Sequence, residues 1–181
     1  VLEKLDEADF GLISTAGSTP QTNGVAVPLF RWRRVLLVQK THPLATRKRV
    51  PTLLELARYP LISYESSTLP ESSLQRAFAA VGVQPQIAMT ARDANLIKAY
   101  VRTGLGAGLL AEMAVGERED DDLRVIDAPL ELPECITWAV VPRGRVLREY
   151  ALELLHGLAP HMDRHDLRRI LEGNQPPEWP E

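Results

Sequence analysis

The segment of residues 90–115 constrains the fold of this chain more than any other stretch. The residues that lead into it, 86–90, have the apolar content of a short buried strand. Asp93 then stands where a helix needs an N-cap acceptor, ahead of apolar residues that recur at helical spacing. Gly104 supplies the left-handed stop of this helix, and residues 107–111 follow as a second apolar strand. Strand, helix and strand in this order indicate a parallel crossover.

Four more residues of this segment have a predicted environment. Lys98 and Arg102 fall on the helix face opposite the apolar residues, so we expect both side chains in solvent. Gly106 and Gly108 flank or enter the second strand, where a backbone can approach a neighbour closely. Close packing or a strand bend explains both glycines better than a ligand cradle does.

Composition and charge exclude several classes of protein. With 181 residues, 45% hydrophobic and 25% charged, the chain can form one ordinary domain or two small lobes of a soluble protein. A net charge of -3 and a pI near 5.9 lack the basic excess typical of nucleic-acid binding, so this segment is not expected to bind DNA by itself. No apolar run approaches the roughly 18 residues that span a bilayer, and no export signal opens the chain. We therefore expect a cytoplasmic protein without membrane contact.

The first residues have the pattern of a helix interior. Val1, Leu2 and Leu5 form an amphipathic stripe that no initiator methionine or capping residue precedes. We interpret the sequence as a fragment of a longer protein. Cys135 is the only cysteine, which excludes an internal disulfide and a CxxC metal site.

The rest of the chain alternates strand-like and helix-like segments. Strands are expected over residues 9–13, 34–39, 61–64, 123–126 and 136–141, and helices over 53–58, around 74–81 and over 146–158. This alternation is typical of a parallel α/β architecture. Residues 166–171 are expected to form a helical turn, and residues 175–181 are too proline-rich to fold alone.

Polar residues follow two of the predicted strands. Residues 14–20 come directly after the strand at 9–13, and polar side chains in this position line the crevice of open α/β sheets. Another polar run, residues 65–68, follows the strand at 61–64. Within it, Thr68 has the capping-box spacing to Glu71, which predicts that its hydroxyl caps the next helix.

Five motifs together resemble one family. They are ADFGLI from Ala8, HPLA from His42, LLELARYPLISY from Leu53, the whole of residues 90–115, and LREYALELLHGLAPHM from Leu147. This set resembles the effector-binding domain of LysR-type transcriptional regulators, and the last two motifs are similar to its CysB-like branch. The resemblance extends from about residue 8 to about residue 166.

The resemblance implies an α/β fold with two lobes joined by crossing strands, like a type II periplasmic solute-binding protein, with the effector in the cleft between them. The second lobe would comprise residues 31–128, and the first lobe residues 1–30 and 129–165, followed by a C-terminal tail of residues 166–181. The first lobe would lack its opening strand, helix and strand. The winged helix-turn-helix that reads promoter DNA would also be absent. The family further implies a homo-oligomer, dimer or tetramer, without a cofactor.

The family also implies a type of ligand. CysB-like domains hold an anion, with sulfate as the type ligand, through threonine side chains and helix N-terminal amides. Ser14 takes the place of one such threonine and keeps its hydroxyl, whereas Leu69 takes the place of another and has no donor. The predicted ligand-binding residues are Ser14, Thr15, Ser66, Ser67, Thr68, Leu69 and Asp93.

The residues after Leu69 argue against sulfate. Pro70 would remove an amide from the first turn of the following helix, and Glu71 would place a negative charge there. A one-residue slip in the alignment would return Thr68 to the contact, but a capping Thr68 would already be engaged. We therefore expect weaker sulfate binding or another effector, such as a zwitterion or an uncharged sulfur or amino-acid metabolite.

Two polar groups keep more than one interpretation. Asp93 either meets the ligand or only caps its helix, and the cap alone explains the residue. Arg31, Arg33 and Arg34 surround Trp32 where the chain should cross between the lobes, and a solvated strand edge explains them without a ligand.

Catalytic and metal-binding roles are disfavoured. His161, Asp163 and His165 are the only cluster with metal-like ligands, and no third histidine or cysteine is tied to it in sequence except the distant His156. Cys135 follows a carboxylate, which disfavours a thiolate nucleophile. No nucleophile elbow, P-loop or dinucleotide loop is present, so we do not expect an enzyme.

A free-standing solute-binding protein of the same fold is the alternative function, and a small α/β enzyme is the third.

Overall fold

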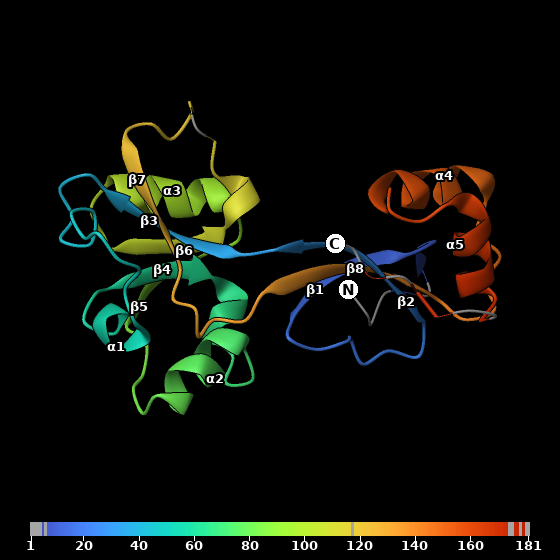
Figure 1. Ribbon diagram of the computed structural model, residues 1–181, viewed down its shortest axis with the longest axis horizontal. Helices are drawn as coiled ribbons and strands as arrows, with labels where there is room; N and C mark the ends of the chain where they lie inside the picture. The colour runs from blue at the N-terminus through green and yellow to red at the C-terminus, as the bar shows by residue number, and fades with distance from the viewer. Residues whose placement is uncertain (1–4, 6, 117, 174–175, 178, 180–181) are drawn as a thin grey trace. The chain divides into compact units, whose positions relative to one another are not determined.

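The computed structural model describes residues 5, 7–116, 118–173, 176–177 and 179 of the chain. The chain forms two compact units (Figure 1). Unit 1 consists of Val1–Trp32 and Glu134–Glu181, and unit 2 consists of Arg33–Pro133. The chain therefore passes from one unit to the other twice, at residues 32–33 and at residues 133–134. None of the helices in the described residues has the length and apolar character to cross a membrane.

Unit 2 is built around a five-stranded sheet with the order β5-β4-β6-β3-β7. Its strands are β3 (Arg34–Gln39), β4 (Leu61–Tyr64), β5 (Ile87–Ala91), β6 (Ala107–Ala111) and β7 (Leu123–Asp127). β4 pairs in parallel with β5 and β6, whereas β3 pairs antiparallel with β6 and β7. The expected parallel architecture is therefore wrong for β3 and β7. β3 pairs with strands that come much later in the chain. The alternation of strands and helices along the sequence therefore does not indicate whether β3 runs parallel or antiparallel to its neighbours.

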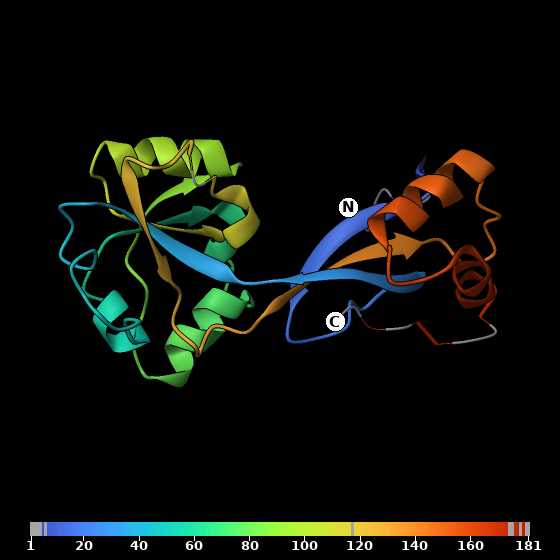
Figure 2. The ribbon, with the colours of Figure 1, turned by 45° about the horizontal axis from the view of Figure 1, so that its top comes forward.

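Helices cover both faces of this sheet (Figures 1 and 2). On one face lie α1 (Leu53–Leu56) and α2 (Ser73–Ala80), and on the other lies α3 (Ala94–Arg102). Two short 3-10 helices, η2 (Glu65–Thr68) and η3 (Glu112–Ala114), follow β4 and β6. Alternate residues of β3 serve the two cores, because Leu36 packs with α1 and α2 while Leu37 packs with α3.

The predicted strand, helix and strand of residues 86–111 are confirmed as β5, α3 and β6. Asp93 caps α3 by accepting a hydrogen bond from the backbone nitrogen of Leu96 at 2.9 Å, and Gly104 follows the helix with a φ of 79°. β5 was expected to be buried, and this is wrong. It lies at the edge of the sheet, where Met89 is 37% exposed.

The two other glycines of this segment serve close packing, as expected. A Cβ atom on Gly106 would lie 2.3 Å from the carbonyl oxygen of Pro60, and one on Gly108 would lie 2.7 Å from Cγ2 of Val101. The absence of a side chain at Gly108 therefore lets α3 rest directly on the backbone of β6.

The expectation that Lys98 lies in solvent is wrong. Its Nζ lies 2.6 Å from Oδ2 of Asp120, and the two side chains are 7% and 2% exposed. Asp120 also accepts hydrogen bonds from Nη2 of Arg102 and from the backbone nitrogen of Gly116, each at 3.0 Å. Burial alone would raise the pKa of Asp120, but the hydrogen bonds from Lys98, Gly116 and Arg102 outweigh it and hold the pKa below its ordinary value. The acidic loop before β7 thus covers this face of α3.

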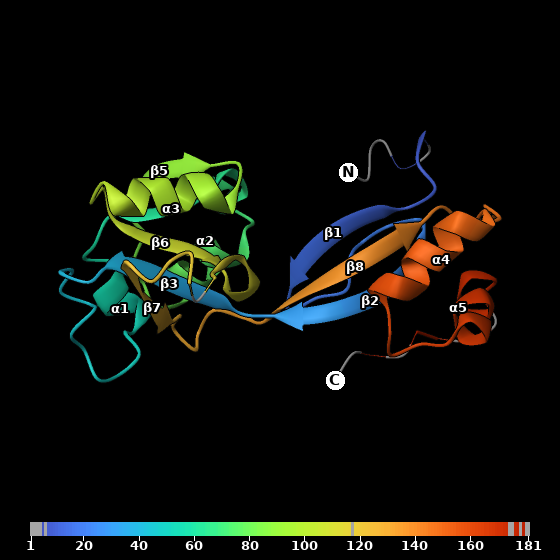
Figure 3. The same cartoon turned by 90° about the horizontal axis from the view of Figure 1, so that it is seen from above.

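Unit 1 contains a three-stranded antiparallel sheet with the order β1-β8-β2 (Figure 3). Its strands are β1 (Gly11–Ala16), β2 (Val25–Trp32) and β8 (Cys135–Val141), and its helices are α4 (Glu149–Leu158) and α5 (Arg164–Leu171). Both helices pack on one face of the sheet, where Val27, Leu155 and Leu167 belong to one buried cluster. The alternation of residues along β8 directs neighbouring side chains to opposite faces.

The expected parallel architecture is also wrong for unit 1, whose strands all pair antiparallel, and two of these strands differ from our expectations in other ways. β1 extends to Ala16, so Ser14 and Thr15 lie inside the strand and not in a loop after it. β2 has no counterpart among the predicted strands, because Pro28 and a register shift between Pro28 and Phe30 interrupt its pattern.

The helices of unit 1 also differ in extent. α4 begins at Glu149, later than the expected residue 146, and Val146 is 91% exposed. A full helix, α5, takes the place of the turn expected from residue 166. Asp163 caps α5 by accepting a hydrogen bond from the backbone nitrogen of Asp166 at 2.8 Å, and its buried residues belong to the same cluster as those of α4.

The predictions for the two ends of the chain fall largely outside the described residues. This applies to the helical stripe at Val1 and Leu2 and to most of residues 175–181. Of the end residues that are described, Leu5 is buried. Trp179 packs edge-on against Trp138, with ring centroids 5.2 Å apart.

Candidate functional site

A pair of hydroxyls lies on one face of the sheet of unit 1. Ser14 in β1 is paired in register with Thr137 in β8, and their side-chain oxygens lie 3.0 Å apart. Nε1 of Trp32, at the end of β2, donates a hydrogen bond to the same Thr137 oxygen at 3.0 Å. The predicted residue Ser14 is exposed and therefore open to a ligand. Thr137 and Trp32 join it only through strand pairing, so the linear sequence carries no sign of this group.

Thr15 does not lie with Ser14, because neighbouring strand residues point to opposite faces. Its Oγ1 accepts a hydrogen bond from Nε1 of Trp138 at 2.8 Å and donates one to the carbonyl oxygen of Ser18. Trp138 is 1% exposed. The Thr15 hydroxyl is thus engaged in holding the fold of unit 1.

In unit 2, the segments that follow the parallel strands meet at one edge of the sheet. η2 follows β4, Asp93 follows β5, and η3 follows β6. Because the carboxyl ends of parallel strands lie at the same edge, this arrangement brings residues 65–68 near Asp93. β3 begins at this edge as well, since it is antiparallel to β6 and Arg34 pairs with Ala111. We call this edge, with residues 64–73, 93 and 112–114, the unit 2 edge.

Most hydroxyls of the unit 2 edge are bound to their own loop. The Oγ atoms of Ser63 and Ser67 lie 2.8 Å apart, and Ser63 also donates to the carbonyl oxygen of Leu109 at 3.2 Å. Oγ1 of Thr68 donates to the carbonyl oxygen of Glu65 at 2.8 Å. Ser66 is exposed. Of the predicted residues here, Ser66 is therefore the one best placed to bring a hydroxyl to a ligand.

The predicted capping box of Thr68 and Glu71 is wrong. Ser72 is the N-cap of α2 and accepts a hydrogen bond from the backbone nitrogen of Gln75 at 3.2 Å. The residue before a proline is held away from the helical region, and Leu69 is extended, with a ψ of 135°. This ends η2 at Thr68 and delays the start of α2. Pro70 and Glu71 consequently precede the helix and are not part of its first turn.

Leu69 and Tyr64 give the unit 2 edge an apolar component. Leu69 is 48% exposed. Burial raises the pKa of Tyr64, the backbone of Ala111 opposes this, and the nearby charge of Asp93 raises the pKa further. The edge therefore combines a leucine side chain, a half-buried phenol and the carboxylate of Asp93, which also caps α3.

The three arginines near the first crossing have different environments. Arg31 is exposed and pairs with Glu134 at 3.4 Å. Arg33 is also exposed, whereas Arg34 is half-buried. Nη1 of Arg34 donates to the carbonyl oxygen of Pro133 at 3.1 Å, and its Nη2 donates to Oγ of Ser73 at 2.6 Å. A solvated strand edge describes Arg31 and Arg33 but not Arg34.

The candidate metal and nucleophile residues lie in different environments. Among the described residues, His165 is exposed, and Nε2 of His161 is buried without a hydrogen-bond partner. Asp163 is engaged as the cap of α5, and Cys135 is buried. Within the described part of the chain, no group of three or more His, Cys, Asp or Glu side chains is placed to hold a metal ion.

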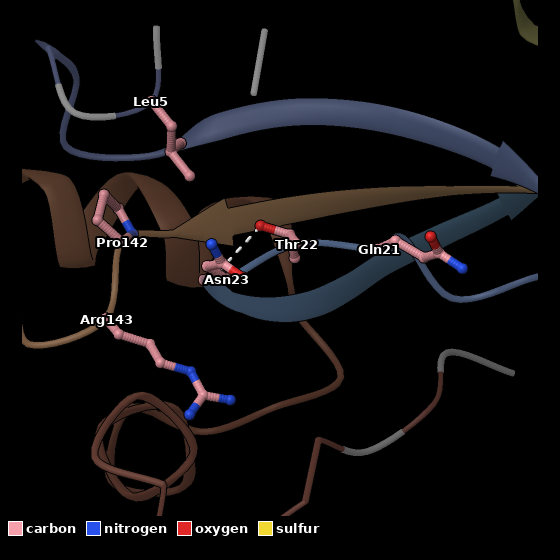
Figure 4. A pocket seen from close by; sticks show the side chains of 7 residues that line it. Leu5, Gln21, Thr22, Asn23, Pro142 and Arg143 are labelled. Carbon is pink, nitrogen blue, oxygen red and sulfur yellow. Dashed lines mark hydrogen bonds between the residues drawn. The ribbon is translucent and has the colours of Figure 1, made fainter. Parts of the chain in front are cut away.

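A pocket of about 780 Å³ lies elsewhere in unit 1 (Figure 4). It is lined by Leu5, Gln21, Thr22, Asn23, Gly24, Pro142 and Arg143. The hydroxyl of Thr22 is already engaged, because it accepts a hydrogen bond from the backbone nitrogen of Gly24 at 3.0 Å. None of the predicted ligand-binding residues lines this pocket.

Known proteins resemble this chain over most of its length. Residues 1–163 match the LysR substrate binding domain. The chain is 35% identical over 168 residues to the HTH-type transcriptional regulator CysB of Burkholderia cenocepacia, which covers 93% of this chain and 53% of that protein. It is 36% identical over 171 residues to the regulator cbl of Escherichia coli, with the same two shares. The chain thus spans about half the length of these relatives, which are transcriptional regulators and not enzymes.

Solved structures agree with the sequence comparisons. The cofactor-binding domain of the Cbl transcriptional regulator superposes with a TM-score of 0.79 at 33% identity, covering 94% of this chain and 75% of that one. The effector binding domain of QuiR, solved with shikimate, has a TM-score of 0.71 at 14% identity and shows the shared fold alone. The mixed sheets and these neighbours confirm the predicted type II periplasmic-binding-like α/β fold. The chain belongs to the LysR substrate binding domain family and, as its motifs predicted, to the CysB-like part of it.

Proposed function

We propose that this chain is the effector-sensing part of a cytoplasmic, CysB-like transcriptional regulator that acts as a homo-oligomer. Units 1 and 2 are the two lobes of this sensor. Promoter DNA is read by a winged helix-turn-helix in the complete regulator, and effector binding changes the equilibrium between sensor conformations. The main support is that Ser66 and Asp93 follow the carboxyl ends of the parallel strands β4 and β5, which is where ligands bind in open α/β sheets.

The ligand is a small sulfur- or amino-acid-related metabolite or anion. The candidate hydroxyls are those of Ser14 and Thr137 within unit 1 and that of Ser66 within unit 2. Thr15, Ser67 and Thr68 contribute through the positions of their loops, since their hydroxyls have partners within the protein.

The charges at the unit 2 edge favour an effector with an amino group over a dianion. Asp93 lies there, and Glu71 lies in the loop before α2. A carboxylate repels sulfate and attracts an ammonium group. Leu69, which is 48% exposed, suits an acyl or alkyl part of the same molecule. An acetylated serine with a free amine combines these features.

The test is calorimetry of the complete regulator with sulfate and with O-acetylserine. We expect O-acetylserine to bind about tenfold more tightly than sulfate, because a single additional charge-assisted hydrogen bond is worth that much. N-acetylserine, which has no ammonium group, is the matched control and should bind less tightly than its O-acetyl isomer. Sulfate binding that equals or exceeds that of O-acetylserine would contradict the proposed ligand class.

A further inference from the structure

Arg34 connects two distant segments of unit 2. It is the first residue of β3, directly after the first crossing of the chain between the units. One nitrogen of its guanidinium donates to Pro133, the last residue of unit 2 before the second crossing, at 3.1 Å. The other donates to Ser73, the first residue of α2, at 2.6 Å. One side chain therefore ties the start of α2 to both ends of unit 2.

The residue before Arg34 makes a similar connection on the other side of the unit 2 edge. The backbone nitrogen of Arg33 donates to Oε1 of Glu112 at 3.0 Å, and the backbone nitrogen of Glu112 donates to the carbonyl oxygen of Arg33 at 3.0 Å. Glu112 is the first residue of η3. Residues 33 and 34 thus hold both the start of α2 and the segment after β6.

The residue next to Ser73, the partner of Arg34, is hydrogen-bonded within the hydroxyl-bearing loop of residues 65–73. Ser72, the neighbour of Ser73, donates its Oγ hydrogen to the carbonyl oxygen of Ser67 at 3.2 Å. Nε2 of Gln75 donates to the same oxygen at 3.1 Å. Ser67 in turn contacts the buried Ser63 at 2.8 Å. The loop of residues 65–73 is consequently fixed at one end by β4 and at the other end by Arg34.

We propose that Arg34 is a positioning residue of the effector site, which holds residues 66–73 in their binding conformation and joins them to the two crossings. This proposal rests on the proposed function of the unit 2 edge. The role requires arginine, because the planar guanidinium presents donors in a fixed fork that reaches two acceptors, whereas a lysine ammonium is a single point. Ligand contacts at Ser66 or Leu69 then affect the conformation of the two crossings through Arg34, although Arg34 itself does not contact the ligand.

The test compares Arg34→Ala, Arg34→Lys and Ser73→Ala in the complete regulator. Arg31→Ala is the matched control, since this exposed arginine near the same crossing pairs with Glu134 in unit 1. The first measurement is amide hydrogen exchange without effector. We expect Arg34→Ala to speed exchange of residues 66–76 by about tenfold, with α3 and β6 unchanged. Ser73→Ala should speed the same residues, Arg34→Lys should speed them less than Arg34→Ala, and Arg31→Ala should leave them unchanged.

The second measurement is the affinity for O-acetylserine. Arg34→Ala should weaken it, and adding Ser73→Ala to Arg34→Ala should weaken it no further, because both changes break the same bond. Unchanged exchange of residues 66–76, faster exchange throughout unit 2, or an unchanged affinity would each overturn the role of Arg34. If the wild-type regulator binds neither O-acetylserine, N-acetylserine nor sulfate, the proposed ligand class fails, and the exchange measurement still decides whether Arg34 positions the loop.

Discussion

Lys98 and Asp120 form a buried ion pair, with 2.6 Å between Nζ and Oδ2 and side chains that are 7% and 2% exposed. The pair joins α3 to the acidic loop before β7. Arg102 and the backbone nitrogen of Gly116 donate further hydrogen bonds to Asp120, so the carboxylate has several donors while the ammonium of Lys98 is tied to this one carboxylate in the described salt bridges. Lys98 therefore depends on Asp120 for its partner more than Asp120 depends on Lys98.

This asymmetry predicts unequal costs of removing each partner. Asp120→Ala leaves the charge of Lys98 buried, and we expect the free energy of unfolding to fall by about 3–5 kcal/mol. Lys98→Met leaves Asp120 with Arg102 and Gly116 and should cost less. Urea denaturation of both variants measures the difference. As a control, Arg164→Ala breaks an exposed pair with Glu153 and should cost at most about 1 kcal/mol. Equal losses for Asp120→Ala and Lys98→Met would contradict the asymmetry.

The hydrogen bonds of Glu55 predict that the stability of unit 2 depends on pH in the acidic range. Hydrogen bonds from Arg49, from the backbone of Thr52 and from Arg47 lower its pKa from 4.5 to about 2. Because the folded state binds this proton less readily than the unfolded state, the contribution of Glu55 is complete above pH 4.5 and is lost as the pH falls toward about 2.

The variant Glu55→Gln isolates this effect. Its free energy of unfolding should be lower than that of the wild type at about pH 7. This gap in free energy should shrink as the pH falls toward about 3. Thermal unfolding across this range measures the gap. A gap that is independent of pH would show that Glu55 does not carry the acid sensitivity.

Two glycines provide opposite predictions for the same substitution. At Gly108 an added Cβ would lie 2.7 Å from Val101 and 2.9 Å from Ile97, so Gly108→Ala should destabilise the protein by about 1–3 kcal/mol. At Gly157, inside α4, an added Cβ meets nothing within 4 Å. Gly157→Ala should stabilise the protein by about 0.5–1 kcal/mol, because alanine favours the helix. Denaturation midpoints decide both signs, and a neutral Gly108→Ala would mean that α3 can move away from β6.

The features that sequence reasoning predicted well depend on local chemistry. The cap at Asp93 and the left-handed stop at Gly104 enclose α3 within a few residues of the chain, and both are confirmed. The burial of Lys98 was not predictable in this way, since its partner Asp120 comes from a loop after β6. The environment of Lys98 is therefore determined by a contact with a residue that is distant in the sequence.

The candidate site shows the same limit. Thr68 and Ser72 are both acceptable caps by residue type, and only the extended backbone of Leu69 before Pro70 selects Ser72. Thr137 and Ser14 are brought together by the register of β1 and β8, which no local pattern in either strand specifies. The sequence thus predicted Ser14 as a candidate, whereas its neighbour Thr137 and the orientation of both side chains required the sheet.

Substitutions at Ser14 and Thr15 should affect different properties, although the two residues are neighbours in β1. The first should affect ligand binding and the second should affect stability. Ser14 is exposed beside Thr137, so Ser14→Ala should weaken binding of O-acetylserine by about tenfold and leave the unfolding midpoint nearly unchanged. Thr15→Val removes the acceptor of the buried Trp138 indole and should cost about 1–3 kcal/mol of stability, with a smaller effect on affinity. Calorimetry and denaturation of both variants test the assignment. If Thr15→Val weakened binding more than Ser14→Ala did, the ligand would contact the opposite face of the sheet.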